Sequence, residues 1–116
     1  MPIIRVKNLR LRTFIGFNPE EKTNKQDVII NVYLETDMTE PMRNDQLSSF
    51  VDYKAITKKV IRFVEESRFN LLEALTQGIL DQIMEEPQII RARVEVDKPH
   101  ALRFAESVSV ELEAQK

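Results

Sequence analysis

The sequence contains no cysteine and a single histidine, His100. Without cysteine the chain has neither disulfides nor thiol chemistry, and one histidine disfavours a zinc or iron site built from protein side chains. We therefore expect no bound metal. Any chemistry has to come from carboxylates, lysines, tyrosines and His100. The absence of cysteine is also compatible with a cytoplasmic location, which we expect for this protein.

Strong charge and long apolar runs are also missing. The net charge is -2 over 116 residues, without a basic stripe, so we do not expect a nucleic-acid partner. No apolar run approaches the ~18 residues of a membrane span, and the N-terminus lacks a signal-peptide pattern, so no membrane association is expected. The length predicts one domain, covering residues 1–116.

Four segments show the period-two alternation of β-strands. The first two are "IIRVKNLRLRTFIG" and "DVIINVYLETD", joined by the polar loop "FNPEEKTNKQ" as a long-looped hairpin. In the first, the apolar phase changes between Val6 and Leu9, which predicts a β-bulge near residues 7–8. The last two strands are "IIRARVEVD" and "ESVSVEL", near the end of the chain.

Two helices are predicted between these pairs of strands, after a polar stretch that holds Pro41 and Asn44. They are "YKAITKKVIRFVEES" and "NLLEALTQGILDQIMEE", each with an apolar stripe at helical spacing. The stripes consist of Ile56, Val60, Phe63 and Val64 in the first helix, and Leu72, Leu75, Ile79 and Ile83 in the second. Asn70 and Glu73 have the spacing of a capping box at the start of the second helix.

The order ββ-αα-ββ predicts an α+β fold, an antiparallel four-stranded sheet with two helices on one face. The opposite face would carry mostly polar residues, namely Asn31, Tyr33, Glu35, Arg91, Arg93, Glu95, Ser109 and Glu111. Such a sheet has two unpaired edges, which favour aggregation unless subunits join them into a closed barrel. We therefore expect an oligomer.

Four residues are candidates for chemistry, and each also has an ordinary structural interpretation. Glu21 has the pattern of a solvated loop charge, and Tyr53 of an aromatic ring packed at a helix start. Glu73 could be the capping partner of Asn70, and Lys98 an exposed lysine in a turn. Residue patterns alone therefore stop at an α+β domain.

Four motifs in order along nearly the whole chain resemble the dihydroneopterin aldolase family, which includes 2'-epimerases of dihydroneopterin triphosphate. They are "RTFIG" followed by Glu21, "VDYKAIT" around Tyr53, "RFNLLEALTQ" around Glu73, and "VDKPHALRFAESVSVEL" around Lys98. The resemblance implies the tunnelling fold, in which ββααββ subunits join their sheets into a barrel. It also implies a pterin substrate, a homo-oligomer (a tetramer or an octamer), and active sites at subunit boundaries.

The resemblance assigns a role to each candidate. Glu73 would accept two parallel hydrogen bonds from the amino group and a ring N–H of the pterin. Lys98, with a bound water, would move the proton of the side-chain hydroxyl. Tyr53, contributed by a neighbouring subunit, would help proton transfer. Glu21 would position the reacting groups.

Further substrate contacts are implied at Val51 and Leu72. No cofactor is needed, because the C6=N5 imine of a dihydropterin can itself accept the electron pair released when its side chain is cleaved. Lys98 therefore need not form a Schiff base.

Within the family, "RLRTFIG" and "HALRFAESVS" are similar to the epimerases. We therefore expect epimerisation at C2' of 7,8-dihydroneopterin triphosphate, by retro-aldol cleavage and re-addition, to 7,8-dihydromonapterin triphosphate. His100 and Arg103 would retain the triphosphate of the cleaved fragment. The alternatives are an aldolase that releases glycolaldehyde and 6-hydroxymethyl-7,8-dihydropterin, and a non-catalytic interaction protein.

Overall fold

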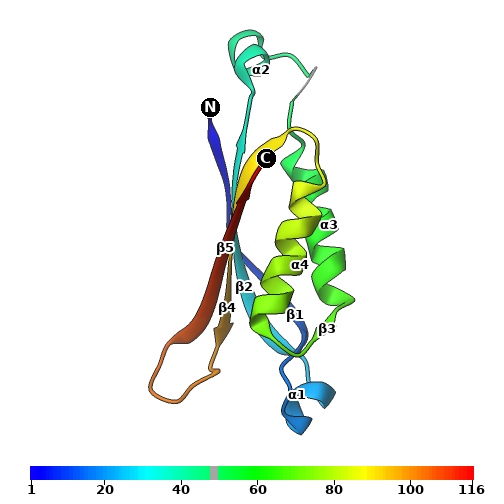
Figure 1. The fold of residues 1–116 in the computed structure, drawn as a ribbon, viewed down its shortest axis with the longest axis vertical. Helices are drawn as coiled ribbons and strands as arrows, with labels where there is room; N and C mark the ends of the chain where they lie inside the picture. The colour runs from blue at the N-terminus through cyan, green and yellow to red at the C-terminus, as the bar shows by residue number, and fades with distance from the viewer. Residues whose placement is uncertain (48–49) are drawn as a thin grey trace.

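A curved β-sheet carries two long helices on one face (Figure 1). The computed structural model describes residues 1–47 and 50–116. The strands are β1 (Ile3–Ile15), β2 (Gln26–Thr36), β3 (Arg68–Phe69), β4 (Ile89–Pro99) and β5 (Ser107–Gln115). The helices are α1 (Pro19–Thr23), α2 (Thr39–Asn44), α3 (Tyr53–Glu65) and α4 (Leu72–Met84). The predicted α+β class is confirmed.

The strand order in the sheet is β3-β1-β2-β4-β5. The four long strands pair antiparallel, as predicted. The expected number of four strands was one too few, because β3 adds a short parallel ladder in which Phe14 faces Arg68 and Ile15 faces Phe69. A strand of two residues is too short to show an alternating pattern. It nevertheless fixes the end of β1, since the Gly16 N–H donates a 3.0 Å hydrogen bond to the Phe69 carbonyl.

The predicted bulge in β1 is present. The register against β2 shifts between Val6 and Leu9, and Asn8 has a φ of 53°. The Asn8 N–H donates a 2.9 Å hydrogen bond to Oδ1 of Asn31 on β2. The bulge thus explains the change of apolar phase within one continuous strand.

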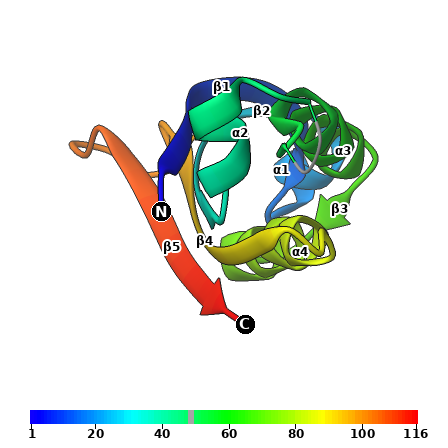
Figure 2. The ribbon, with the colours of Figure 1, turned by 90° about the horizontal axis from the view of Figure 1, so that it is seen from above.

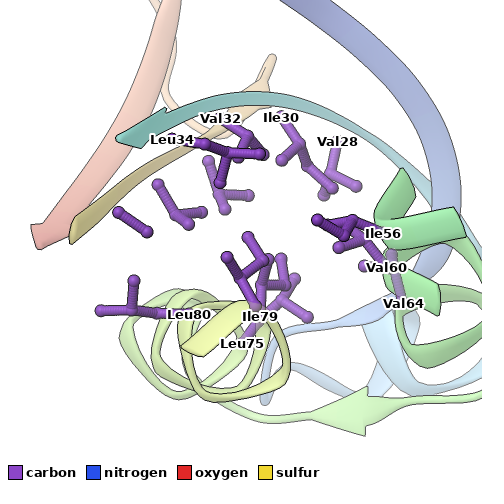
Figure 3. Close-up of a cluster of buried hydrophobic side chains, with 14 of the residues drawn as sticks. Val28, Ile30, Val32, Leu34, Ile56, Val60, Val64, Leu75, Ile79 and Leu80 are labelled. Carbon is purple, nitrogen blue, oxygen red and sulfur yellow. The ribbon is translucent and has the colours of Figure 1, made fainter. Parts of the chain in front are cut away.

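The core lies between the sheet and the helices (Figure 3). Alternate residues of β2 are buried in it, as predicted: Val28, Ile30, Val32 and Leu34. The helices contribute the buried residues Ile56, Val60, Val64, Leu75, Ile79, Leu80 and Ile83. Each such side chain contributes about 1.5–3 kcal/mol by leaving water, which makes this layer the main source of stability.

Helix ends differ in part from expectation. α4 begins at Leu72 with Leu71 in the cap position and no capping side chain, so the predicted capping box of Asn70 and Glu73 is wrong. At α3, by contrast, Asp52 accepts a 3.0 Å hydrogen bond from the Ala55 N–H. Two residues, Asn70 and Leu71, connect β3 to α4.

Two segments predicted as polar and irregular contain short helices. The loop at residues 17–26 includes α1, with a proline in its first turn, and the polar stretch with Pro41 and Asn44 includes α2. Both helices are shorter than two turns, so neither has a periodic apolar stripe. Residues 48–49 of that polar stretch lie outside the described residues.

The two ends of the subunit carry different elements (Figure 1). α1, β3, the start of α4 and the β4–β5 loop gather at one end, which we call the α1 end. α2 lies at the other end. α3 and α4 run in opposite directions, so the start of α3 also lies toward that end, away from the start of α4. α3 has 13 residues and is therefore about 20 Å long.

Both outer strands leave an edge unpaired in the described part of the chain. β5 pairs only with β4, and β1 pairs on its outer side with β3 only at residues 14–15. Figure 2, a view from above, shows the sheet as an open curve with β5 at its free margin. None of the helices in the described ranges is long and apolar enough to cross a membrane.

Candidate active site

Glu21 and Lys98 form an ion pair at the α1 end. Lys98 lies near the end of β4 and Glu21 in α1, and Nζ of the lysine donates a hydrogen bond to Oε2 of the carboxylate. The side chains are only 15% and 16% exposed, respectively. Because the pair is largely shielded from water, its interaction is stronger than that of a surface salt bridge.

Two further hydrogen bonds, from Gln26 and Asn18, orient the Glu21 carboxylate. Nε2 of Gln26 donates to Oε2 of Glu21 at 3.0 Å and to the Ile15 carbonyl at 2.7 Å. The Asn18 N–H donates to Oε1 at 3.3 Å. Hydrogen bonding from Lys98, then from Gln26 and Asn18, lowers the pKa of Glu21 despite its partial burial. The carboxylate is therefore ionised at neutral pH.

Gly16 makes room for this carboxylate. Its φ is +123°, a backbone conformation that residues with a side chain rarely adopt. A Cβ atom at this position would lie 2.2 Å from Cδ of Glu21. Glycine is therefore required for both the turn after β1 and the placement of Glu21.

The start of α4 brings Leu72 and Glu73 to the same end of the subunit. The Glu73 side chain is exposed in the first turn of α4, whereas Leu72 is 8% exposed and belongs to the core. A carboxylate in the first turn is favoured by the helix dipole. Glu73 is thus free to bind a ligand through its side chain, whereas Leu72 can do so only through its backbone.

A cavity of about 230 Å³ opens beside Glu21. Its lining includes Gly16, Glu21, Lys22, Arg68, Phe69 and Asn70. The cavity therefore lies between α1 and the β3–α4 connection, next to the ion pair and close in sequence to Glu73.

Tyr53 and Val51 lie at the opposite end of the subunit. Tyr53 is the first residue of α3 and is 58% exposed, while Val51 is buried. The length of α3 alone puts about 20 Å between Tyr53 and the β3 end of that helix. One subunit thus brings Glu21 and Lys98 together but leaves Tyr53 far from them.

His100 and Arg103 lie in the exposed loop between β4 and β5. His100 has a φ of 63° and lines a shallow pocket with Arg12 and Gln26. The Arg103 guanidinium lies 5.6 Å from the ring centre of Phe104, which is fully exposed. The loop begins two residues after Lys98, so both residues lie at the same end of the subunit as the ion pair.

A scan against protein-family models matches residues 4–113 to the dihydroneopterin aldolase family. This chain belongs to that family. It is 55% identical to the dihydroneopterin triphosphate 2'-epimerase of Pseudomonas aeruginosa, over 97% of this chain and 91% of that protein. It is 46% identical to the Escherichia coli protein of the same name, over 98% and 95% of the two chains.

A solved structure shows the same fold. The E. coli dihydroneopterin aldolase crystallised in complex with neopterin superposes with a TM-score of 0.92 and 24% identity, covering 98% of this chain and 99% of that one. The predicted tunnelling fold of the subunit is thereby confirmed, with β3 as the additional strand.

Several residues around the Glu21–Lys98 pair were not singled out from the sequence. Gln26 stands at the end of a polar loop, and no local pattern marks it as a partner of Glu21. Gly16 could have been found, because a glycine directly after a strand suggests a positive φ. Lys22 and Arg68 are two separate surface cations in the sequence, and only the fold places them on one cavity.

Proposed function

We propose that this chain catalyses the epimerisation of 7,8-dihydroneopterin triphosphate at C2', giving 7,8-dihydromonapterin triphosphate. The supporting observation is the identity of 55% and 46% to two 2'-epimerases across nearly the whole chain. Identity to the aldolase of known structure is 24%. The epimerase is therefore the best-supported activity within the family.

The active site would lie at the boundary between two subunits. Glu21, Lys98 and Glu73 would come from one subunit and Tyr53 from its neighbour, because one chain holds Tyr53 at the opposite end. Joining the free edges of β1 and β5 between copies would close the sheets into a barrel and satisfy both edges. A homo-oligomer, as a tetramer or an octamer, follows, and native mass spectrometry would measure its size.

The pterin would be held by Glu73 and by backbone groups. An ionised carboxylate accepts two parallel hydrogen bonds from an amino group and a ring N–H on the same edge of the pterin. Leu72 and Val51 have buried side chains, so their proposed contacts are through the main chain. This arrangement leaves the substrate's side chain to be directed toward Lys98.

Bond cleavage begins with transfer of the proton from the 2'-hydroxyl to a water molecule held at Lys98. The C2' oxygen forms a carbonyl, the C1'–C2' bond breaks, and its electron pair moves into the C6=N5 imine of the ring, where N5 takes up the proton from the water. The products are an enamine on the pterin and an aldehyde fragment that carries the triphosphate. The ionised Glu21 fixes the position of the Lys98 ammonium throughout.

Epimerisation requires the aldehyde to stay bound and rotate. C1' then attacks the other face of the aldehyde, the C1'–C2' bond forms again, and the new alkoxide at C2' takes up a proton. Tyr53 would assist proton transfer in this cycle. His100 and Arg103, on the adjoining loop, would contact the triphosphate of the fragment and slow its escape.

The aldolase is the second candidate, since release of the same fragment completes an aldolase reaction. To distinguish the two, the purified protein is incubated with dihydroneopterin triphosphate, and the products are dephosphorylated and separated on a chiral column. A monapterin peak is expected. A hydroxymethylpterin as the sole product would instead establish the aldolase. Lys98→Ala serves as the control and should abolish either product.

A further inference from the structure

The cavity beside Glu21 has an excess of positive charge. Lys22 on α1 and Arg68 on β3 both line it, and both side chains are exposed. The cavity also contains Glu21, but that carboxylate is already paired with Lys98. In the described part of the chain, neither Lys22 nor Arg68 has a carboxylate oxygen within 4.0 Å. Two uncompensated cations therefore face one cavity.

Two other charged pockets lack this imbalance. Arg12 and His100 share a pocket with Asp27, and the Arg12 guanidinium lies 3.6 Å from that carboxylate. Lys58 and Arg62, on α3, share a pocket with two carboxylates, those of Glu65 and Glu66. An anion entering these pockets would meet negative charge, whereas the cavity beside Glu21 offers only positive charge that is still unpaired.

The Arg68 guanidinium is held in position before any ligand arrives. It stacks over the Phe14 ring, 3.9 Å from the ring centre. Its Nη1 lies 3.5 Å from the Lys22 carbonyl, so the two walls of the cavity are linked. A stacked guanidinium loses less freedom on binding and presents a planar set of donors that suits phosphate oxygens. Lys25 adds a third cation, 5.7 Å from the centre of the same ring.

We propose that this cavity binds the triphosphate of the substrate, with Lys22 and Arg68 as the principal contacts. The proposal rests on the proposed function, which puts C2' at the Lys98–Glu21 pair, and Glu21 also lines the cavity. Its volume of about 230 Å³ is below the ~300–1,000 Å³ usual for a whole ligand, so it suits one part of the substrate.

This assignment explains how one site favours epimerisation over release. After cleavage the aldehyde is joined to the enzyme only through its triphosphate, because its bond to the pterin is broken. Charge-assisted contacts from Lys22 and Arg68 would keep it beside the enamine until C1' attacks again. The two residues would then set the ratio of epimer to cleavage product, in addition to any contribution from the loop cations.

The first test compares two double variants that remove the same charge. Lys22→Ala/Arg68→Ala alters the cavity, and Lys58→Ala/Arg62→Ala removes two exposed cations on α3 as a matched control. We expect the first to lower kcat/KM for the triphosphate substrate about 100-fold, or about tenfold for each cation removed. The loss on unphosphorylated dihydroneopterin should be much smaller, and the share of hydroxymethyl product should rise. Equal losses on both substrates would overturn the proposal.

Binding of inorganic tripolyphosphate tests the site without turnover. Calorimetry on the intact oligomer should detect binding by the wild-type and control proteins, weakened at least tenfold in Lys22→Ala/Arg68→Ala. Arg68→Lys should give an intermediate affinity, since it keeps the charge but not the planar stack on Phe14. Unchanged tripolyphosphate affinity in the double variant would refute the site. If the wild type turns over neither pterin yet shows this pattern, the proposed function fails and the anion site stands.

Discussion

Glu21 and Lys98 stand 77 positions apart in the chain and share a hydrogen bond at one end of the subunit. The contact joins the short helix α1 to the end of β4, and Gln26 ties the same carboxylate to the end of β1. Three separate segments thus meet at one carboxylate. The geometry of the site depends on all three.

Replacing Glu21 by Gln should lower both activity and stability at neutral pH. Hydrogen bonds from Lys98 and Gln26 lower the pKa of Glu21 below its ordinary value of 4.5. The ionised carboxylate therefore stabilises the fold fully at pH values above 4.5, and this stabilisation is lost as the pH falls through the lowered pKa. We expect the free energy of unfolding of the variant at pH 7 to be about 1–3 kcal/mol lower than that of the wild type. The difference from wild type should shrink in acid, as measured by urea unfolding across pH.

The neighbouring carboxylate provides the control for this experiment. Glu20 is exposed in the same helix, so Glu20→Gln should leave the pH profile of stability close to wild type. A difference between Glu21→Gln and wild type that persists unchanged into acid would show that the Lys98 pair is not its origin.

Gly16→Ala should disable the site while leaving the fold in place. The added Cβ would meet the Glu21 carboxylate and would have to adopt an unfavourable φ. A shift of Glu21 by about 1 Å can cost roughly 100-fold in kcat/KM. Turnover is measured alongside circular dichroism and oligomer size. Wild-type kcat/KM in a folded Gly16→Ala protein would contradict the assigned role.

Two inactive variants should restore activity when mixed, if Tyr53 and Glu73 reach each site from different subunits. Tyr53→Phe and Glu73→Ala are each expected to reduce turnover strongly. After joint unfolding and refolding at equal amounts, about a quarter of the sites would combine an intact Tyr53 with an intact Glu73, by random assembly. Turnover of the mixture is compared with that of each variant refolded alone. No recovery in verified mixed oligomers would place both residues in the same subunit's site.

Arg103→Ala tests the loop between β4 and β5. Its guanidinium lies on an exposed loop near Phe104, so we expect a modest loss of about threefold to tenfold on the triphosphate substrate, because exposed charges are screened. The unphosphorylated substrate should be affected less. If both substrates lose the same factor, the residue does not contact the phosphates. His100→Ala is the parallel variant on the same loop.

The regular elements could be predicted because their signals are local. Alternation from Val28 to Leu34 specifies a strand with one buried face, and the bulge in β1 is visible as a change of apolar phase. The stripes of α3 and α4 specify which helical faces enter the core. These patterns depend on residues within a few positions of one another, so the chain can be interpreted segment by segment.

The two-residue strand β3, the missing cap at Leu71 and the short helix α1 have no such periodic signal. β3 exists because Arg68 and Phe69 meet the end of β1, more than 50 positions earlier in the chain. α1 is shorter than two turns, and its Glu21 is held by Lys98 and Gln26 from other segments. A pairing between distant segments leaves no period in the sequence of either one.

The sequence by itself determined the order of the elements, the faces that form the core, and the motifs shared with the dihydroneopterin aldolase family. Only the tertiary structure decided that Lys98 pairs with Glu21, that Tyr53 lies at the far end of its own subunit, and that Lys22 and Arg68 face one cavity. The physical reason is that burial of alternating or helically spaced apolar residues is a local property of the chain. Electrostatic sites, in contrast, depend on distances between side chains that only folding brings close.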